Sequence, residues 1–428
     1  MTQLKKGDII KLQSGQSITV MEELGEGGQG YVYRVKHDSG KEYALKWYKS
    51  PYNSDWMYNN IGKLIAKGAP SNDFIWPQML TNKMDSFFGY VMELRSPEYK
   101  DIIKGRKVVD FNKFSNPVLT KITAAMKICD ALKKLHANGL IFYDLNDGGF
   151  FINPADGKVL ICDCDNVCPL GQSDMGGKMR YNAPEIVEGK SKANKQTDYF
   201  SLSVILFLLF YGNHPFEGAK ALQYPCYTPA VEKEIYGQNA VFVYDPVNDC
   251  NRPVRSIHTN VIKFWQFYPK TLNEAFIKAF SKDAITNPDN RIRETEWINI
   301  LCRTRDLLVK CGSCGEETFV RKEGCFFCHH PLNIPFGLNI NDRKIPIFQG
   351  KFLYASDTTG ETGDKVFEET GRVVTNKGTS QMGIRNISTN QWAINSSDKI
   401  ETFNNGDVLI LNKGEEIIFS NDIKATVI

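Results

Sequence analysis

The sequence predicts an α+β protein in which a strand-rich lobe is followed by a larger helical lobe, a cysteine-rich knuckle and a small all-β domain. Three observations support this order. Residues 1–95 contain short alternating runs around a glycine-rich turn. Residues 96–310 contain apolar residues spaced three and four apart, as in amphipathic helices. From about residue 345 onward, β-branched residues and turn signals such as Asn-Asn-Gly-Asp dominate.

The amino-acid composition limits the classes of protein to which this chain can belong. The 428 residues suggest two or three domains, and 42% hydrophobic with 24% charged residues is ordinary for a soluble globular protein. A formal charge of +3 is too small to imply nucleic acid or an anionic membrane as a partner. The longest apolar run, Val204–Tyr211, is too short for a membrane span, and the N-terminus lacks a signal-peptide core. Most of the 11 cysteines are scattered, which indicates a reducing cytoplasm.

The first lobe contains a candidate phosphate site. Strands are expected over Ile18–Leu24 and Tyr31–Lys36, on either side of a GEGGQG turn, and over Tyr43–Trp47. A GxGxxG pattern alone is weak, because plain hairpins and Rossmann loops share it. Here a strand follows the glycines, whereas the dinucleotide fold needs a helix. Glycines let backbone N–H groups approach phosphates closely, and Lys46 on the third strand adds a cation.

The second lobe contains a pair of carboxylates. The segment YDLNDGGFFINPADGKVLICDCDN, residues 143–166, places Asp144 after a short apolar run and Asp163 at the end of an expected hairpin. In phosphoryl transfer one such acid orients the acceptor hydroxyl and the other holds magnesium on the ATP phosphates. Helices are expected around this segment at Pro117–Ala137, Asp198–Tyr211, Leu272–Phe280 and Glu294–Leu308.

Further motifs follow in a fixed order. Glu185 closes Ala-Pro-Glu, Asp198 begins a long apolar helix, and Arg291 precedes the last helix of the lobe. With the flap, Lys46 and the two acids, the chain resembles eukaryotic-type (Hanks-like) protein kinases over roughly residues 15–308. The resemblance implies a bilobal protein-kinase fold, with an N-lobe at 1–95 and a C-lobe at 96–308. It also implies that Glu185 and Arg291 form a buried ion pair and that Asp198 braces the catalytic loop.

The same resemblance implies the reaction and its residues. ATP would be the cofactor and a protein serine or threonine the acceptor, with Asp144, Lys46 and Asp163 as catalytic residues. Met92 would be the gatekeeper, followed by the adenine hinge. The expected ATP contacts are Gly25, Gly27, Gly30, Val32, Ala44, Lys46, Met92, Glu93 and Leu94.

Several positions depart from the family pattern. Phe142-Tyr143 replaces the His-Arg that precedes the catalytic acid, and Asn146 replaces a lysine that contacts the γ-phosphate. Gly149 replaces a magnesium-binding asparagine, and Cys164-Asp165 replaces Phe-Gly.

The helix expected between Trp56 and Ser71 contains no acid to pair with Lys46, so Asn59 or Asn60 would have to serve. Two readings stay open. One is an active kinase with a rearranged metal site, in which Asp163, Asp165 and Asn146 hold Mg²⁺ or Mn²⁺. The other is a nucleotide-binding pseudokinase that acts as a scaffold or sensor.

A narrower resemblance concerns several phrases, including GAPSNDFIWP and FVYDPVNDCNRPV. They are similar to segments of bacterial kinases encoded beside a phosphatase and a von Willebrand-type tellurite-resistance protein. This implies a bacterial stress or defence setting and a cognate phosphatase as a partner.

Two further units are expected after the kinase-like region. Four cysteines in two CxxC pairs predict a zinc ribbon over residues 309–332, and a linker is expected at 333–344. The zinc ligands would be Cys311, Cys314, Cys325 and Cys328. A small all-β domain is expected at 345–428, and its segment GIRNISTNQWAINSSDKIETFNNGDVLILNKGEEIIF, residues 383–419, resembles the last strands of forkhead-associated domains, which bind phosphothreonine peptides. Arg372 and Arg385 are the candidates for phosphate contact, and a generic β-sandwich interaction domain is the alternative.

Overall fold

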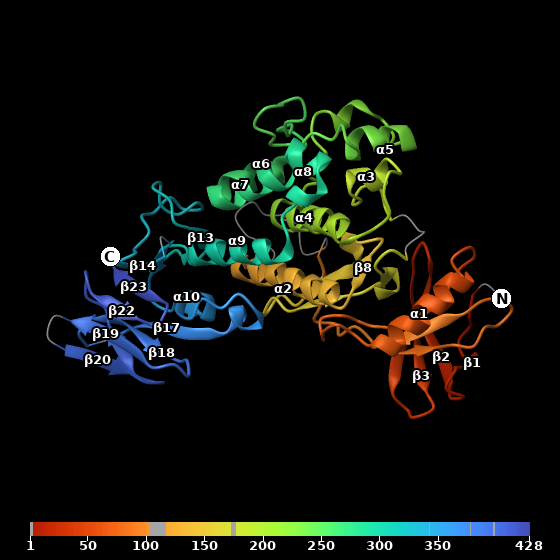
Figure 1. Ribbon diagram of the computed structural model, residues 1–428, viewed down its shortest axis with the longest axis horizontal. Coiled ribbons are helices and arrows are strands. Elements are labelled where there is room, and N and C mark those ends of the chain that lie inside the picture. Colours follow the sequence, from red (N-terminus) through yellow and green to blue (C-terminus); the bar gives the residue numbers. More distant parts are fainter. Residues whose placement is uncertain (1–2, 103–116, 173–176, 342, 377, 397–398) are drawn as a thin grey trace.

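The computed structural model describes residues 3–102, 117–172, 177–341, 343–376, 378–396 and 399–428. Figure 1 shows a strand-rich lobe at one end, a helical lobe in the middle and an all-β region beside α2 and α9 at the other end. The order of these parts along the chain is the order predicted from the sequence.

The N-terminal lobe is an antiparallel sheet with strand order β1-β2-β3-β4-β6-β5 and one helix. Its alternating strands bury Val20, Tyr33, Leu45 and Trp47 in one cluster. Ser54 caps the helix by accepting a hydrogen bond from the N–H of Met57. The elements are β1 (Ile9–Lys11), β2 (Ser17–Glu26), β3 (Gly30–His37), β4 (Glu42–Tyr48), α1 (Asp55–Lys67), β5 (Met79–Leu80) and β6 (Gly89–Met92).

The C-terminal lobe is built around α4, whose residues from Phe200 to Tyr211 are all buried. A helix that is apolar on all sides belongs in the centre of a lobe. The four helices expected here are confirmed, although the last ends at Asp306 and Leu308 begins a strand instead. The helices are α2 (Val118–Ala137), α3 (Pro184–Val187), α4 (Lys195–Tyr211), α5 (Pro229–Tyr236), α6 (Thr259–Phe267), α7 (Lys270–Ala279), α8 (Lys282–Thr286) and α9 (Glu294–Asp306).

Short strands between α2 and α3 position the two acids. β9 and β10 form the expected hairpin, and β8 pairs with β11, so the loops that follow β8 and precede β11 lie side by side. Asp144 is in the first of these loops and Asp165 in the second. The strands between α2 and α3 are β8 (Leu140–Phe142), β9 (Phe150–Ile152), β10 (Val159–Ile161) and β11 (Val167–Pro169). β7 (Lys100–Asp101) precedes α2 and pairs with β9.

The all-β region consists of a six-stranded sheet, β15-β14-β23-β22-β19-β20, and a four-stranded sheet, β16-β17-β18-β21. Both contribute to one core around Leu338, Val373, Ile384 and Trp392. The preceding cysteine segment contains β12 (Leu308–Lys310) and β13 (Glu317–Phe319). The remaining elements are β14 (Phe336–Ile340), β15 (Arg343–Ile347), β16 (Phe352–Tyr354), α10 (Ala355–Thr358), β17 (Glu369–Thr375), β18 (Met382–Asn386), β19 (Trp392–Ser396), β20 (Lys399–Phe403), β21 (Val408–Ile410), β22 (Glu416–Ile418) and β23 (Lys424–Val427).

The prediction of a linker at 333–344 is wrong from Phe336 onward. β14 and β15 pair in register from Phe336 opposite Ile347 to Ile340 opposite Arg343, so the all-β region begins before residue 345. Pro346 lies in the edge strand β15, where a missing N–H does not interrupt the sheet.

The all-β region is fixed to the end of α9. The ammonium of Lys351 is buried and donates to the carbonyls of Arg305, Asp306 and Leu308, which satisfies acceptors at the helix C-terminus. Arg343 adds an ion pair to Asp306 at 2.7 Å.

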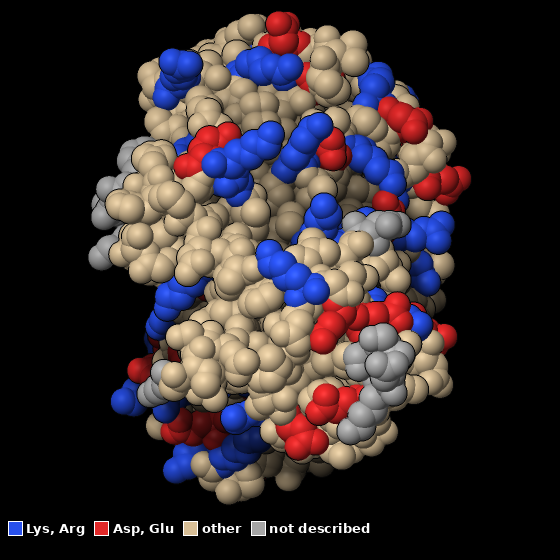
Figure 2. Space-filling view, turned by 90° about the vertical axis from the view of Figure 1, so that its left-hand side faces the viewer, with Lys and Arg blue, Asp and Glu red and all other residues tan. Residues whose placement is uncertain are grey.

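Figure 2 faces the end of the molecule that the all-β region forms and shows positive and negative side chains spread across it. Among the described residues, we find no helix whose length and hydropathy suit a membrane span.

Candidate active site

A pocket lies between the glycine flap and the loop that contains Asp144. The flap is the turn between β2 and β3, closed by a hydrogen bond from the N–H of Gly27 to the carbonyl of Gly30. A Cβ at Gly30 would lie 2.4 Å from the carbonyl oxygen of Trp47, so only glycine fits there. Predicted site residues from separate motifs meet in this pocket, namely Gly27, Gly30, Val32, Lys46, Asp144, Asn146 and Asp163.

The other residues expected to contact ATP lie on neighbouring strands. Ala44 on β4 pairs with Met92 on β6, and Glu93 and Leu94 follow directly. Gly25 lies on β2 opposite Val32. None of these five lines the described pocket, which is the part of the site on the phosphate side.

Lys46 is buried at the back of the pocket and is surrounded by acceptors. Its ammonium lies 2.8 Å from a carboxylate oxygen of Asp165 and 3.2 Å from one of Asp163. Burial alone would lower the pKa of Lys46, but these two carboxylates outweigh it and raise the pKa above its usual value. Lys46 is therefore a permanent cation.

Asp165 takes a different position from the one predicted. Its carboxylate is completely buried and accepts hydrogen bonds from Lys46 and from the hydroxyls of Tyr48, at 2.6 Å, and Tyr90, at 2.9 Å. It does not line the pocket. A role as a magnesium ligand does not fit this geometry, because its oxygens are already used by three donors.

The expectation that Asn59 or Asn60 pairs with Lys46 is also wrong. Asn59 is exposed, and the amide of Asn60 donates 2.7 Å to the carbonyl of Val167 instead. Asp165 supplies the acid that α1 lacks.

Asp163, by contrast, is open to the pocket, with its side chain 46% exposed. Its backbone is left-handed, with φ of 55°. Non-glycine residues rarely adopt this conformation, and those that do are often found at functional sites. Asp163 presents an open carboxylate to the pocket, which suits a magnesium ion. The side-chain oxygen of Asn146, by contrast, already accepts from the Lys178 ammonium at 3.0 Å and from the N–H of Gly148 at 3.2 Å.

The loop containing Asp144 is held by the segment before α3. The N–H of Lys178 donates 2.9 Å to one carboxylate oxygen of Asp144. A Cβ at Gly177 would lie 2.7 Å from that oxygen, so glycine permits the approach. The Lys178 ammonium donates 3.0 Å to the side-chain oxygen of Asn146. The hydrogen bond from Lys178 fixes one carboxylate oxygen of Asp144 at the pocket.

Two departures from the family pattern have visible structural roles. Tyr143 is buried, donates 3.1 Å to the carbonyl of Asp165 and packs edge-on against Trp56 of α1. At Gly149 a Cβ would lie 3.2 Å from the carbonyl oxygen of Cys162, so a larger side chain would require a local shift.

The predicted supporting residues lie where the resemblance implied. One carboxylate oxygen of Asp198 accepts from the N–H of Phe142 at 3.0 Å and from His136 at 2.8 Å. His136 also contacts Glu294 on α9. Arg291 donates to both carboxylate oxygens of Glu185 at 2.7 and 2.8 Å, and its side chain is only 1% exposed. Two-point Arg–carboxylate pairs are rigid, so this pair fixes α3 below the site.

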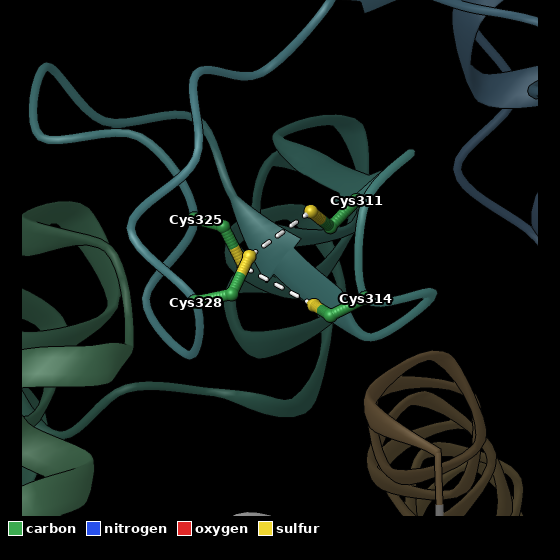
Figure 3. Close-up of side chains that lie close together, drawn as sticks. All are labelled: Cys311, Cys314, Cys325 and Cys328. Carbon is green, nitrogen blue, oxygen red and sulfur yellow. Dashed lines mark hydrogen bonds between the residues drawn. The ribbon is translucent and has the colours of Figure 1, made fainter.

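The four predicted cysteine ligands meet at one point, as Figure 3 shows. Sγ of Cys311 lies 3.6 Å from that of Cys328, and Sγ of Cys314 lies 3.7 Å from that of Cys325. A tetrahedral zinc ion with Zn–S bonds of about 2.3 Å needs sulfur atoms roughly 3.8 Å apart, so the cluster fits zinc. Phe326 and Phe327 of the second pair pack against Phe267 of α6, which attaches the segment to the helical lobe.

In the all-β region, Arg372 on β17 pairs with Arg385 on β18, and both side chains are exposed. The structure thus brings the two candidate arginines together on one face of the four-stranded sheet.

Sequence reasoning missed several pocket residues. Gln29 in the flap accepts from Lys46 at 3.0 Å and donates to Asn166 at 2.9 Å. Tyr48 follows Lys46 at the two-residue spacing of a strand, and that spacing could have revealed it. For Gly177 and Lys178 no local pattern gave a signal.

Residues 18–264 match the protein kinase domain family. The serine/threonine-protein kinase AtPK1/AtPK6 of Arabidopsis thaliana is 25% identical over 226 residues, which are 50% of this chain and 47% of that protein. Protein kinase YegI of Escherichia coli O157:H7 is 24% identical over 331 residues, 70% of this chain and 46% of its own. The probable serine/threonine-protein kinase PknB of Lactococcus lactis subsp. lactis is 23% identical over 215 residues, 47% of this chain and 33% of its own. The chain therefore spans less than half the length of these relatives.

The family match runs from Ile18 in β2 to Phe264 in α6 and covers more than half of the chain, including every residue of the pocket. The predicted bilobal kinase fold is confirmed: the chain belongs to the protein kinase family.

Proposed function

We propose that this protein transfers the γ-phosphoryl group of ATP to a serine or threonine hydroxyl of a protein substrate. The observation that carries the proposal is the meeting of Lys46, Asp144 and Asp163 in one pocket under the glycine flap. Relatives named as serine/threonine kinases support the choice of acceptor.

The charged residues of the pocket have separate roles in this proposal. Lys46 contacts the α- and β-phosphates. Asp163 would hold the metal ion, joined by Asn146 once Lys178 releases the amide oxygen. Bound magnesium would offset negative charge on the β- and γ-phosphates. The acceptor oxygen forms a bond to the γ-phosphorus while the bond from that phosphorus to the bridging oxygen breaks. ADP leaves, and Asp144 takes the hydroxyl proton.

Phosphate incorporation tests the proposal. The protein is incubated with Mg/ATP or Mn/ATP and a mixture of protein substrates, with Asp144→Asn as control. We expect incorporation that the variant loses. Absence of incorporation with both metals, or equal incorporation in the variant, would refute transfer.

The alternative, a nucleotide-binding pseudokinase, is favoured by Gly149, which offers no metal ligand where the family has asparagine. A metal-dependent rise in melting temperature with ATP, without transfer, would support that alternative.

We further propose roles for the C-terminal units. The four thiolates form a structural zinc ribbon, and the two sheets form a forkhead-associated-like β-sandwich. Arg372 and Arg385 would contact a phosphopeptide there. From the resemblance to bacterial kinases, we also propose that the protein acts in cytoplasmic stress or defence signalling beside a cognate phosphatase. Titration of a phosphothreonine peptide library tests the sandwich: binding should be lost in an Arg372→Ala, Arg385→Ala double variant.

A further inference from the structure

The phosphate pocket has a shortage of positive charge. ATP brings about four negative charges, and the pocket itself adds the carboxylates of Asp144 and Asp163. Lys46 is already paired with two carboxylates. Asn146 is neutral where related kinases have a lysine for the γ-phosphate. Beyond the metal ion, a nucleotide held only by Lys46 would lack a cationic side chain at the γ-phosphate end.

Lys178 is the only other cation among the described residues that line the pocket. It reaches the position of the missing lysine from a different part of the chain. Its ammonium lies 3.0 Å from the side-chain oxygen of Asn146, which is the residue that replaced the lysine. Its backbone N–H is fixed 2.9 Å from the Asp144 carboxylate, so the base of the side chain has a defined position.

The hydrogen bond from Lys178 to Asn146 adds too little stability to explain by itself why this contact is present. Lys178 is exposed, so its end of this partly buried hydrogen bond stays open to solvent, and the bond contributes only modestly to folding. A lysine ammonium is a compact charge with three donors on a flexible stem, so it can exchange one amide oxygen for phosphate oxygens without a change in the backbone.

On the basis of the proposed kinase function, we propose that Lys178 binds the γ-phosphate of ATP and replaces the catalytic-loop lysine absent at Asn146. In related kinases this positive charge belongs to a lysine two residues after the catalytic acid. Here Lys178, in the segment before α3, supplies it. The γ-phosphate contact therefore forms only when Gly177 and Lys178 are seated against Asp144.

Nucleotide affinity tests this without activity. Dissociation constants for ADP and for a non-hydrolysable ATP analogue are measured for the wild-type protein, Lys178→Ala, Lys178→Arg and the exposed control Lys233→Ala. A charged contact to the γ-phosphate predicts roughly tenfold weaker analogue binding in Lys178→Ala, with less than about twofold change for ADP. Lys178→Arg should retain most of the affinity, and Lys233→Ala all of it. Equal weakening for both nucleotides, or for neither, would overturn the assignment.

Activity provides the second test. Lys178→Thr should lower kcat, whereas Lys178→Arg should keep most of it, because arginine still brings a cation to the γ-phosphate. If the wild-type protein transfers no phosphate while Lys178→Ala still weakens only the analogue, the kinase function fails and the Lys178 assignment stands. If the wild-type protein is active and Lys178→Ala matches it in transfer and affinity, the assignment fails and the kinase function stands.

Discussion

The ammonium of Lys46 lies 2.8 Å from Asp165, whose side chain is fully shielded from solvent, and 3.2 Å from Asp163, whose side chain is 46% exposed. Lys46 thus forms ion pairs with one buried and one solvent-exposed carboxylate, and these two acids are two residues apart in the sequence. Because both acids belong to the same short turn, Lys46 is held without any acid from α1. No acid of α1 is therefore needed to hold Lys46 at the pocket.

Replacing Asp165 should destabilise the whole lobe. Asp165→Asn would leave the Lys46 charge short of a buried partner and force the amide to face the hydroxyls of Tyr48 and Tyr90. Removing one member of a buried pair costs about 3–5 kcal/mol, and we expect a loss near about 3 kcal/mol in unfolding free energy. Urea unfolding measures it.

Asp163→Asn is the matched control, because that carboxylate contacts the same lysine but is open to solvent. It should abolish phosphate transfer with a much smaller loss of stability. Equal stability of Asp165→Asn and the wild-type protein would contradict the structural role of Asp165.

Gly177→Ala should impair transfer without impairing ADP binding. The added Cβ would collide with the Asp144 carboxylate and the carbonyl of Tyr143, both 2.7 Å away, and displace the segment that orients Asp144. A misplacement of about 1 Å costs up to roughly 100-fold in rate. We expect kcat to fall at least roughly tenfold on that basis, while the affinity for ADP is retained.

Steady-state kinetics and ADP titration measure the two effects of Gly177→Ala. Gly363→Ala is the control, since a Cβ there meets no atom within 4 Å; an unchanged kcat in Gly177→Ala would refute the packing argument.

Much of the fold could be predicted because its signals are local. The alternation in β2 to β4, the apolar character of α4 and the hairpin between Asp144 and Asp163 are all properties of neighbouring residues. The cysteine cluster was predictable for the same reason, because two CxxC pairs bring their own turn geometry.

The charge pairing of the site could not be predicted this way. Asp165 reads as a metal ligand in the sequence because it is two residues from Asp163, but the 3₁₀ turn Cys164–Asn166 directs its carboxylate into the core. Whether Lys178 reaches Asn146 depends on how the segment before α3 packs on the catalytic loop, a long-range contact that leaves no periodic trace. Each residue type was visible, but its partner depended on tertiary packing.

His136 should make stability depend on pH. It lies between Asp198 of α4 and Glu294 of α9, with the ring of Tyr199 beside it. Burial opposes the charged form, but the two carboxylates prevail and raise the pKa of His136 from 6.5 to about 9. Its stabilisation is therefore complete below pH 6.5 and is lost as pH rises through about 9.

The loss should reach at most about 3 kcal/mol, because one pKa unit corresponds to about 1.4 kcal/mol. The measurement is the difference in unfolding free energy between the wild-type protein and His136→Asn across this pH range, which removes contributions from other titrating groups. A difference that does not change with pH would show that His136 is neutral in the folded protein.

Removing zinc should loosen the helical lobe as well as the ribbon. The purified protein should contain about one zinc ion per chain, since four thiolates complete a tetrahedral site. Phe326 and Phe327 lie between the second cysteine pair and contact Phe267, with ring centroids 5.2 and 5.7 Å apart. Without the metal, Phe326 and Phe327 are no longer held against Phe267, which becomes more exposed to solvent. Cys314→Ser or strong chelation should therefore lower the melting temperature.

Metal analysis tests the zinc content, and thermal unfolding tests the loss of stability. Cys250→Ser, at an exposed cysteine outside the cluster, should change neither value. A protein that melts at the same temperature with and without zinc would show that packing of Phe326 and Phe327 alone holds the ribbon in place.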